Sequence, residues 1–126
     1  MRLVIAGGGT GGHLFPGLAL AEELLARPGE HAVMFMGARG GIEERIVPLH
    51  GYRLELLPSL KGGFFNFSGP KKAWQGCRGY LQARRTILSF NADAVVGLGG
   101  YASALPLMAA WGVEVPCMLL EQNVIP

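Results

Sequence analysis

The stretch GGGTGGH, Gly7 to His13, is the first place in the sequence where residue types and spacing indicate chemistry. It lies between the apolar run LVIA and an apolar helical pattern, and a glycine loop in that position turns several backbone N–H groups toward one point. Phosphate oxygens bind at such a point, because glycine has no Cβ to hold them away and the positive end of the helix dipole favours an anion. We therefore predict a phosphate-binding loop; the alternative is a tight turn without a ligand.

The same stretch also satisfies the dinucleotide fingerprint GxGxxG through Gly7, Gly9 and Gly12. A dinucleotide site further expects an acidic residue at the end of the second strand, but that strand ends in FMGARGG, without Asp or Glu. Arg39 in this segment suits a 2′-phosphate, so an NADP-binding oxidoreductase domain stays open as an alternative. A Walker loop is excluded, because no Lys-Ser or Lys-Thr pair follows the glycines.

Three further groups of polar residues extend the candidate site. His13 ends the loop, and an imidazole that titrates near neutrality beside a phosphate site is a candidate general base. The segment GLGGYAS, Gly97 to Ser103, forms a second glycine-rich loop after a later strand and adds two hydroxyl groups. The alternative for this segment is again a turn without a ligand. The segment LLEQN ends an apolar strand with three polar residues, Glu121 to Asn123, at the kind of edge where parallel sheets bind ligands.

Basic and aromatic residues concentrate between Glu55 and Asp93, a stretch without an acidic residue. Apolar side chains enter a membrane interface and basic ones attract anionic lipid, so this segment is predicted to contact a membrane surface. The alternative for the aromatic residues is the core, and it is strongest for Trp74. Nucleic acid is not expected as a partner, because the sequence pI is only about 8.7. The predicted membrane contacts are Lys61, Phe64, Phe65, Phe67, Lys71, Lys72 and Trp74.

Length and composition predict one globular domain: the chain has 126 residues, of which half are hydrophobic and 16% are charged. Apolar runs of strand length alternate with helical patterns, which predicts βαβ units and an α/β fold with a doubly wound, mostly parallel, Rossmann-like sheet. The predicted strands are 3–6, 32–36, 52–57, 94–98 and 115–120. The predicted helices run from Pro16 to the Pro28-Gly29 stop, from Ile42 to Leu49, from about Pro70 to Phe90 and from Ala104 to Trp111.

Right-handed crossovers favour the strand order 3-2-1-4-5, which makes the first and fourth strands neighbours. Ligands of such a sheet bind beyond the carboxyl ends at this switch point, where both glycine loops emerge. In the helix from Pro70, the residues Trp74, Cys77, Leu81 and Leu88 are expected near one apolar face. Cys77 and Cys117 are interpreted as reduced core thiols, because both lie in apolar segments without metal-ligand spacing. We expect no signal peptide and no spanning helix.

The quoted segments together resemble the MurG family, bacterial glycosyltransferases of peptidoglycan synthesis. The matching pieces are GGGTGGHLFPGLALAEEL (7–24), KGG (61–63), GLGGYAS (97–103) and EQNVIP (121–126). The resemblance implies that residues 1–126 form the amino-terminal, acceptor-binding and membrane-facing domain of an inverting GT-B transferase, with the donor-binding carboxyl-terminal domain absent. That family moves N-acetylglucosamine from UDP-N-acetylglucosamine to the 4-hydroxyl of the lipid-linked muramoyl-pentapeptide (lipid I to lipid II). It works without a metal or other cofactor, as a peripheral protein at the cytoplasmic face of the cell membrane.

The resemblance also implies roles for individual residues. His13 and Glu121 would lie in the catalytic cleft, and the sequence does not rank them as the base. The donor sugar would be contacted by Thr10, Gly11, Gly12 and Asn123, and the acceptor diphosphate by Gly8, Gly9, Gly99, Gly100, Tyr101 and Ser103. Leu120 stands where the family commonly has His, so any role of that His is absent.

An inverting transfer needs an attacking hydroxyl, a base and a stabilised leaving diphosphate. Because this domain would supply only the first two, we expect the isolated chain to fold without transferring sugar. The alternative in another functional class is a non-catalytic membrane-anchor subunit of a split glycosyltransferase.

Overall fold

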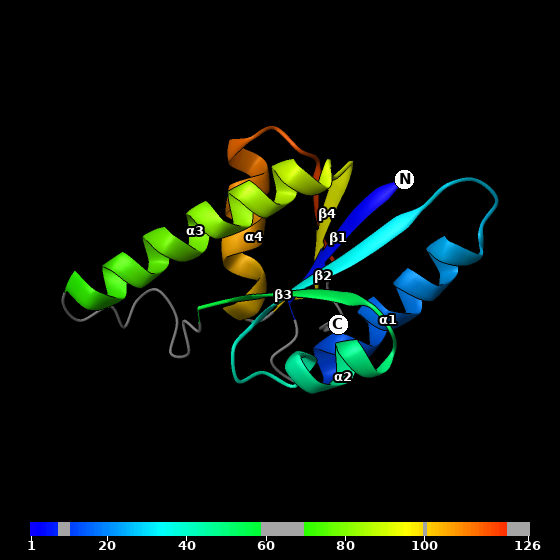
Figure 1. The fold of residues 1–126 in the computed structure, drawn as a ribbon, viewed down its shortest axis with the longest axis horizontal. Helices are drawn as coiled ribbons and strands as arrows, with labels where there is room; N and C mark the ends of the chain where they lie inside the picture. Colours follow the sequence, from blue (N-terminus) through cyan, green and yellow to red (C-terminus); the bar gives the residue numbers. More distant parts are fainter. Residues whose placement is uncertain (8–10, 59–69, 100, 121–126) are drawn as a thin grey trace, which may run out of the picture.

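A computed structural model of the chain describes residues 1–7, 11–58, 70–99 and 101–120; for residues 11–13, 70–73 and 101 it describes the backbone alone. The described strands form one parallel five-stranded sheet in the order β3-β2-β1-β4-β5 (Figure 1). The order predicted from right-handed crossovers is therefore confirmed, and β1 lies at the centre of the sheet. The strands are β1 (Arg2–Ala6), β2 (Ala32–Ala38), β3 (Arg53–Leu57), β4 (Ala94–Gly97) and β5 (Cys117–Leu119).

Helices cover both faces of the sheet, which makes the fold doubly wound as expected: α1 and α2 lie on one face and α3 and α4 on the other (Figure 1). Successive strand residues point to opposite faces, so β1 supplies Leu3 and Ile5 to the core under α1 and α2, and Val4 and Ala6 to the core under α3 and α4. The helices are α1 (Gly11–Ala26), α2 (Glu43–Leu49), α3 (Pro70–Phe90) and α4 (Ala104–Gly112), and the 3-10 turn η2 (Tyr101–Ser103) precedes α4.

The first helix begins earlier than its sequence indicated. Proline favours a first helical position, but α1 begins at Gly11 and Pro16 lies inside it. The glycines at the end of the loop adopt helical backbone angles, and Pro16 is close enough to the helix start to interrupt only the early hydrogen bonds. As a result His13 lies in the first turn of α1 instead of preceding the helix.

The face of α3 that the sequence indicated as apolar is turned to solvent. Trp74 is 65% exposed, Leu81 56% and Leu88 47%, so the interpretation of Trp74 as a core residue is wrong. The helix packs instead through the face that carries Ala83, Ile87 and Phe90, which are buried. On the same helix, a Cβ on Gly79 would lie only 2.6 Å from Leu105 of α4. The close approach of α3 to α4 therefore requires a residue without a side chain at Gly79.

Both cysteines are exposed, which corrects their interpretation as core thiols. Cys77 lies on the outer face of α3, and Cys117 lies on β5, an edge strand that pairs with β4 and is exposed along its length. Among the described helices, none is both long enough and apolar enough to cross a membrane.

Candidate functional site at the carboxyl edge of the sheet

The turns after β1 and β4 meet at the carboxyl edge of the sheet. The two strands pair in parallel, with Ala6 opposite Gly97, and the Leu98 N–H donates to the Ala6 carbonyl at 2.8 Å. Gly7 and Gly99 have φ angles of 129° and 91°, in the region that favours glycine. A Cβ on Gly7 would lie 3.1 Å from the Gly99 carbonyl oxygen. Glycine is therefore required at Gly7 both for its backbone conformation and for the close approach of the two turns.

Helix α1 is held against the β4 turn by a second glycine contact. A Cβ on Gly17 would lie 2.5 Å from Leu98 Cδ1, so the absence of a side chain lets the helix approach Leu98 and Ile5 closely. Leu14 and Leu18 complete this packing and are buried. The contact orients a 16-residue helix with its amino-terminal end at the carboxyl edge, where its dipole favours an anion.

Ser103, a predicted contact for the diphosphate, is buried at the N-cap position of α4. Tyr101 precedes it in η2, and its backbone alone is described. The turn after β4 therefore leads through η2 directly into α4, just as the turn after β1 leads into α1. The contact of these two hydroxyl groups with a ligand stays a prediction.

Other predicted site residues lie wholly or partly outside the described parts of the chain, and their roles also stay predictions. For Gly11, Gly12, His13, Lys71 and Lys72 the backbone is placed in a helix and nothing more is described. Outside the described residues are Gly8, Gly9, Thr10, Lys61, Phe64, Phe65, Phe67, Gly100, Glu121 and Asn123.

A buried carboxylate organises the β2–α2 turn, and sequence reasoning missed it. Glu43 has no exposed surface, and its Oε1 accepts the N–H of Ala38 at 2.9 Å. A Cβ on Gly37 would lie 2.2 Å from the Glu43 side chain, and one on Gly41 would lie 2.5 Å from it. The signal in the sequence was the pair of glycines flanking a short turn before a glutamate, because the side chain folds back into the space that they leave.

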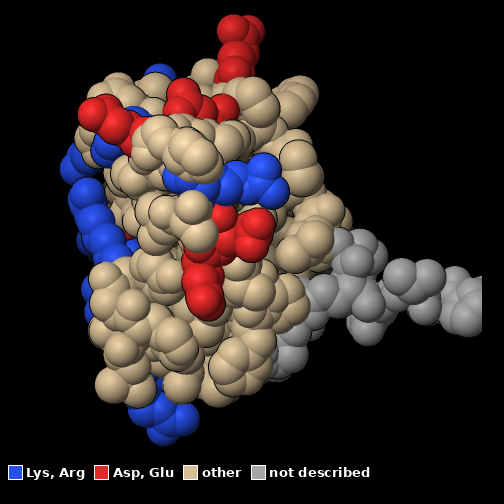
Figure 2. Space-filling view, turned by 90° about the vertical axis from the view of Figure 1, so that its right-hand side faces the viewer, with Lys and Arg blue, Asp and Glu red and all other residues tan. Residues whose placement is uncertain are grey.

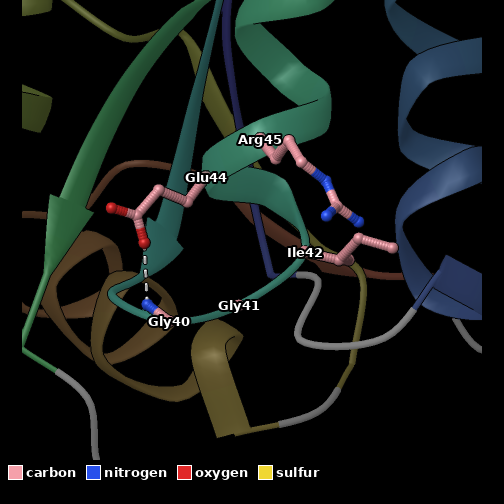
Figure 3. A pocket seen from close by; sticks show the side chains of 5 residues that line it. All are labelled: Gly40, Gly41, Ile42, Glu44 and Arg45. Carbon is pink, nitrogen blue, oxygen red and sulfur yellow. Dashed lines mark hydrogen bonds between the residues drawn. The ribbon is translucent and has the colours of Figure 1, made fainter.

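The β2–α2 turn separates two recesses. Figure 3 shows the first, of about 670 Å³, which is lined by Gly40, Gly41, Ile42, Glu44 and Arg45. There the Glu44 carboxylate accepts the Gly40 N–H at 2.9 Å, whereas Arg45 points away from it, toward α1. Arg39 lines the other recess, on the α3 side. Arg39, which the sequence offered as a contact for the 2′-phosphate of NADP, therefore does not line the same recess as Gly40 and Gly41.

The exposed face of α3 combines apolar and basic side chains. Arg78, Leu81 and Arg85 line one shallow depression on it, and Arg84 and Leu88 extend a second. A different face of the molecule is mixed: Figure 2 shows acidic side chains near its centre, with basic ones among them and along its left margin. In the part of the chain that the structure describes, no three His, Cys, Asp or Glu side chains are grouped as metal ligands.

Comparison with known proteins identifies related sequences and a similar fold. Residues 3–126 match the family model described as the glycosyltransferase family 28 N-terminal domain. A protein of Geobacter sulfurreducens is 49% identical over all of this chain and 35% of its own length, and one of Trichlorobacter lovleyi is 46% identical over 33% of its length. Both are named UDP-N-acetylglucosamine–N-acetylmuramyl-(pentapeptide) pyrophosphoryl-undecaprenol N-acetylglucosamine transferase. The chain thus spans about a third of the length of these relatives.

The crystal structure of Acinetobacter baumannii MurG has a similar fold. It superposes on 94% of this chain with a TM-score of 0.77, at 23% sequence identity and over 33% of its own length. The doubly wound arrangement of this chain is therefore also found in a solved structure.

Proposed function

The chain belongs to the family of glycosyltransferase family 28 N-terminal domains, and from this membership we propose that it is the acceptor-binding domain of an inverting N-acetylglucosaminyltransferase. Its acceptor is an N-acetylmuramyl-pentapeptide on pyrophosphoryl-undecaprenol, and its donor is UDP-N-acetylglucosamine, as in the names of the relatives. The observation that carries the proposal is the meeting of the Gly7 and Gly99 turns at the amino-terminal end of α1. Such a site suits the acceptor diphosphate.

The proposed reaction is a single displacement. The acceptor hydroxyl oxygen bonds to the anomeric carbon of N-acetylglucosamine while the bond from that carbon to UDP breaks, and a base on this domain takes the hydroxyl proton. His13, in the first turn of α1, is the first candidate for the base, and Glu121 is the second. The acceptor diphosphate is held by backbone N–H groups of the glycine turns and by the dipole of α1.

Two further parts of the site complete this proposal. Thr10, Gly11, Gly12 and Asn123 contact the donor sugar, while the leaving diphosphate is stabilised by a donor-binding domain beyond this chain. The reaction needs no metal or other cofactor. These assignments rest on the match between the motifs of this chain and those of the family.

The outer face of α3 is proposed to contact the membrane that carries the acceptor lipid. Trp74, Leu81 and Leu88 offer apolar surface, and the arginines beside them would attract an anionic leaflet at the cytoplasmic face. Figure 1 shows that α3 begins beyond the carboxyl end of β3, on the side of the molecule where the strands end, and lies beside α4 further along. A protein docked through α3 would thus hold its carboxyl edge close to the lipid surface.

The test joins this chain to the remaining two thirds of the Geobacter sulfurreducens relative and measures sugar transfer to the lipid-linked acceptor. We expect transfer by the chimera and none by the 126-residue chain alone. His13→Ala in the chimera should lower kcat at least 100-fold, whereas His50→Ala, at an exposed position after α2, should not. A folded chimera without transfer would contradict the proposed function. Full activity of His13→Ala would exclude His13 as the base and leave Glu121 as the candidate.

A further inference from the structure

A recess beside the proposed diphosphate site is not used by the function described above. It has a volume of about 490 Å³ and opens between the β2–α2 turn, the segment after β3, and α3. Because β2 and β3 are parallel to β1, their ends lie at the same edge of the sheet as the glycine turns. We call it the Arg39–Arg78 recess; its lining residues are Arg39, Pro58, Gln75, Arg78 and Gln82.

The walls of the Arg39–Arg78 recess are anchored to β3. The Arg39 backbone N–H donates to the Leu57 carbonyl at 3.1 Å. Gln82 Nε2 donates to Glu55 Oε2 at 2.9 Å and to the Leu56 carbonyl at 2.8 Å. Both amide hydrogens of Gln82 are thereby engaged, so its Oε1 remains as an acceptor for an N–H group.

The chemistry of the recess suits a peptide that carries a carboxylate. Arg39 and Arg78 supply two planar guanidinium groups, which bind carboxylates through paired hydrogen bonds. Gln75 and Gln82 supply amide groups, which match the donors and acceptors of a peptide backbone. The five lining residues include no acid, and the carboxylate of Glu55 accepts a hydrogen bond from one of them, Gln82.

A lipid headgroup fits the recess less well than a peptide. Of the large exposed apolar side chains of α3 that would accompany a lipid tail, Leu81 and Leu88 line the depressions on the outer face with Arg84 and Arg85. Within the Arg39–Arg78 recess, Pro58 is the one apolar residue of the lining. The surface proposed for lipid contact and the recess proposed for peptide contact thus differ in chemistry, and they meet at Arg78 and Gln82.

We propose that the Arg39–Arg78 recess binds the carboxyl-terminal carboxylate of the pentapeptide on the acceptor, an inference that rests on the proposed function. The names of the relatives give their acceptor a pentapeptide. Neighbouring strands lie about 4.8 Å apart, so the ends of β2 and β3 are roughly 5 and 10 Å from the end of β1. Five extended residues span about 17 Å, which is enough to reach from an acceptor sugar at the glycine turns to this recess.

The test measures binding of soluble N-acetylmuramyl-pentapeptide, without the pyrophosphoryl lipid, to the 126-residue chain by NMR titration. Arg39→Gln and Arg78→Gln should each weaken binding about 5- to 20-fold, and so should conversion of the peptide's terminal carboxylate to a carboxamide. The double variant Arg39→Gln/Arg78→Gln should discriminate little between carboxylate and carboxamide, because it removes the guanidinium groups that the carboxylate would contact. Arg53→Gln, an exposed arginine at the amino end of β3, makes the same change of charge and should bind like the unaltered chain.

Equal binding of the carboxylate and carboxamide probes by the unaltered chain would overturn the proposal without the need for any variant. Absence of binding would overturn it too. So would arginine variants that bind anionic vesicles more weakly but bind the pentapeptide as the unaltered chain does. The chimera separates this inference from the proposed function. Suppose that the chimera transfers sugar to an acceptor that lacks the peptide, and that Arg39→Gln leaves its KM for the pentapeptide acceptor unchanged. These results would support the transferase function and contradict the peptide site.

Discussion

Gly7 and Gly99 face each other across the ends of β1 and β4, so closely that a Cβ on Gly7 would lie 3.1 Å from the carbonyl oxygen of Gly99. The two residues are distant in the sequence, and the parallel pairing of their strands brings them together. This approach draws two glycine turns into one candidate binding site.

Gly7→Ala should lower the free energy of unfolding by about 2–4 kcal/mol, because it adds a contact with the Gly99 turn to the strain of a φ angle of 129°. Gly51→Ala is the matched control, since Gly51 has a φ of 80° and no atom within 4 Å of an added Cβ. That variant should lose only about 1 kcal/mol. Urea unfolding followed by circular dichroism measures both, and equal losses would show that the contact between the turns does not matter.

Glu43→Ala should destabilise the chain by about 2–4 kcal/mol, because it leaves a cavity and deprives the buried Ala38 N–H of its acceptor. Glu44→Ala changes the neighbouring residue, whose exposed carboxylate accepts the Gly40 N–H, and should cost less than 1 kcal/mol. The same unfolding experiment compares the two variants. If Glu43→Ala were as mild as Glu44→Ala, the buried carboxylate would not be what holds the β2–α2 turn.

Arg84→Gln with Arg85→Gln should weaken sedimentation with anionic vesicles about 10- to 30-fold, since each basic residue near such a surface contributes about 1 kcal/mol. Both arginines lie on the exposed face of α3 beside Leu88. The pair Arg27→Gln and Arg53→Gln removes the same charge elsewhere and should change binding much less. Equal losses in the two pairs would mean that net charge, and not α3, governs binding.

Trp74→Ala tests the apolar part of the same contact. The side chain is 65% exposed, so its removal should leave stability nearly unchanged while weakening binding to the vesicles. Leu25→Ala, at an exposed position of α1, is the control for loss of surface apolar area. Unchanged vesicle binding in Trp74→Ala would remove this residue from the contact.

Cys117 should react slowly with iodoacetamide at pH 8, because neighbouring atoms partly desolvate its thiol and thereby raise its pKa, and the thiolate is the reactive form. Its Sγ also donates to the Val115 carbonyl at 3.3 Å, which favours the protonated form. The rate should keep rising with pH beyond the ordinary pKa of cysteine. Measurement in Cys77→Ser isolates the site, and a rate that levels off at or below that ordinary pKa would contradict the prediction.

The sheet could be predicted from the sequence because apolar runs and glycine turns alternate regularly, and crossover handedness then determines the strand order. The bounds of α3 also follow directly, since Pro70 suits a helix start. Its buried face does not follow, because large apolar residues lie on both sides of the helix. Leu81 and Leu88 are exposed, whereas Ile87 and Phe90 are buried on the face that packs against the core. The exposure of both cysteines could not be predicted for a similar reason. Apolar neighbours in the sequence do not specify which side of a helix or strand packs against the core.

At the candidate site, the sequence indicates which two turns meet, because their strands are neighbours in a doubly wound sheet. The role of Glu43 could not be predicted from the sequence, because it depends on a side chain that folds back across a turn. The grouping of Arg39 with Arg78 was equally hidden, because it depends on how α3 lies against the end of β3.

The central position of β1 also affects the order in which the protein folds. The Arg2 backbone N–H binds the Asp93 carboxylate, a partner 91 residues away in the chain. During synthesis β1 leaves the ribosome before β4, so one of its two edges has no strand to pair with until β4 has been made. We therefore expect the nascent chain to hold the buried strand β1 half-paired until β4 has been made, a state in which chaperone binding would be favoured.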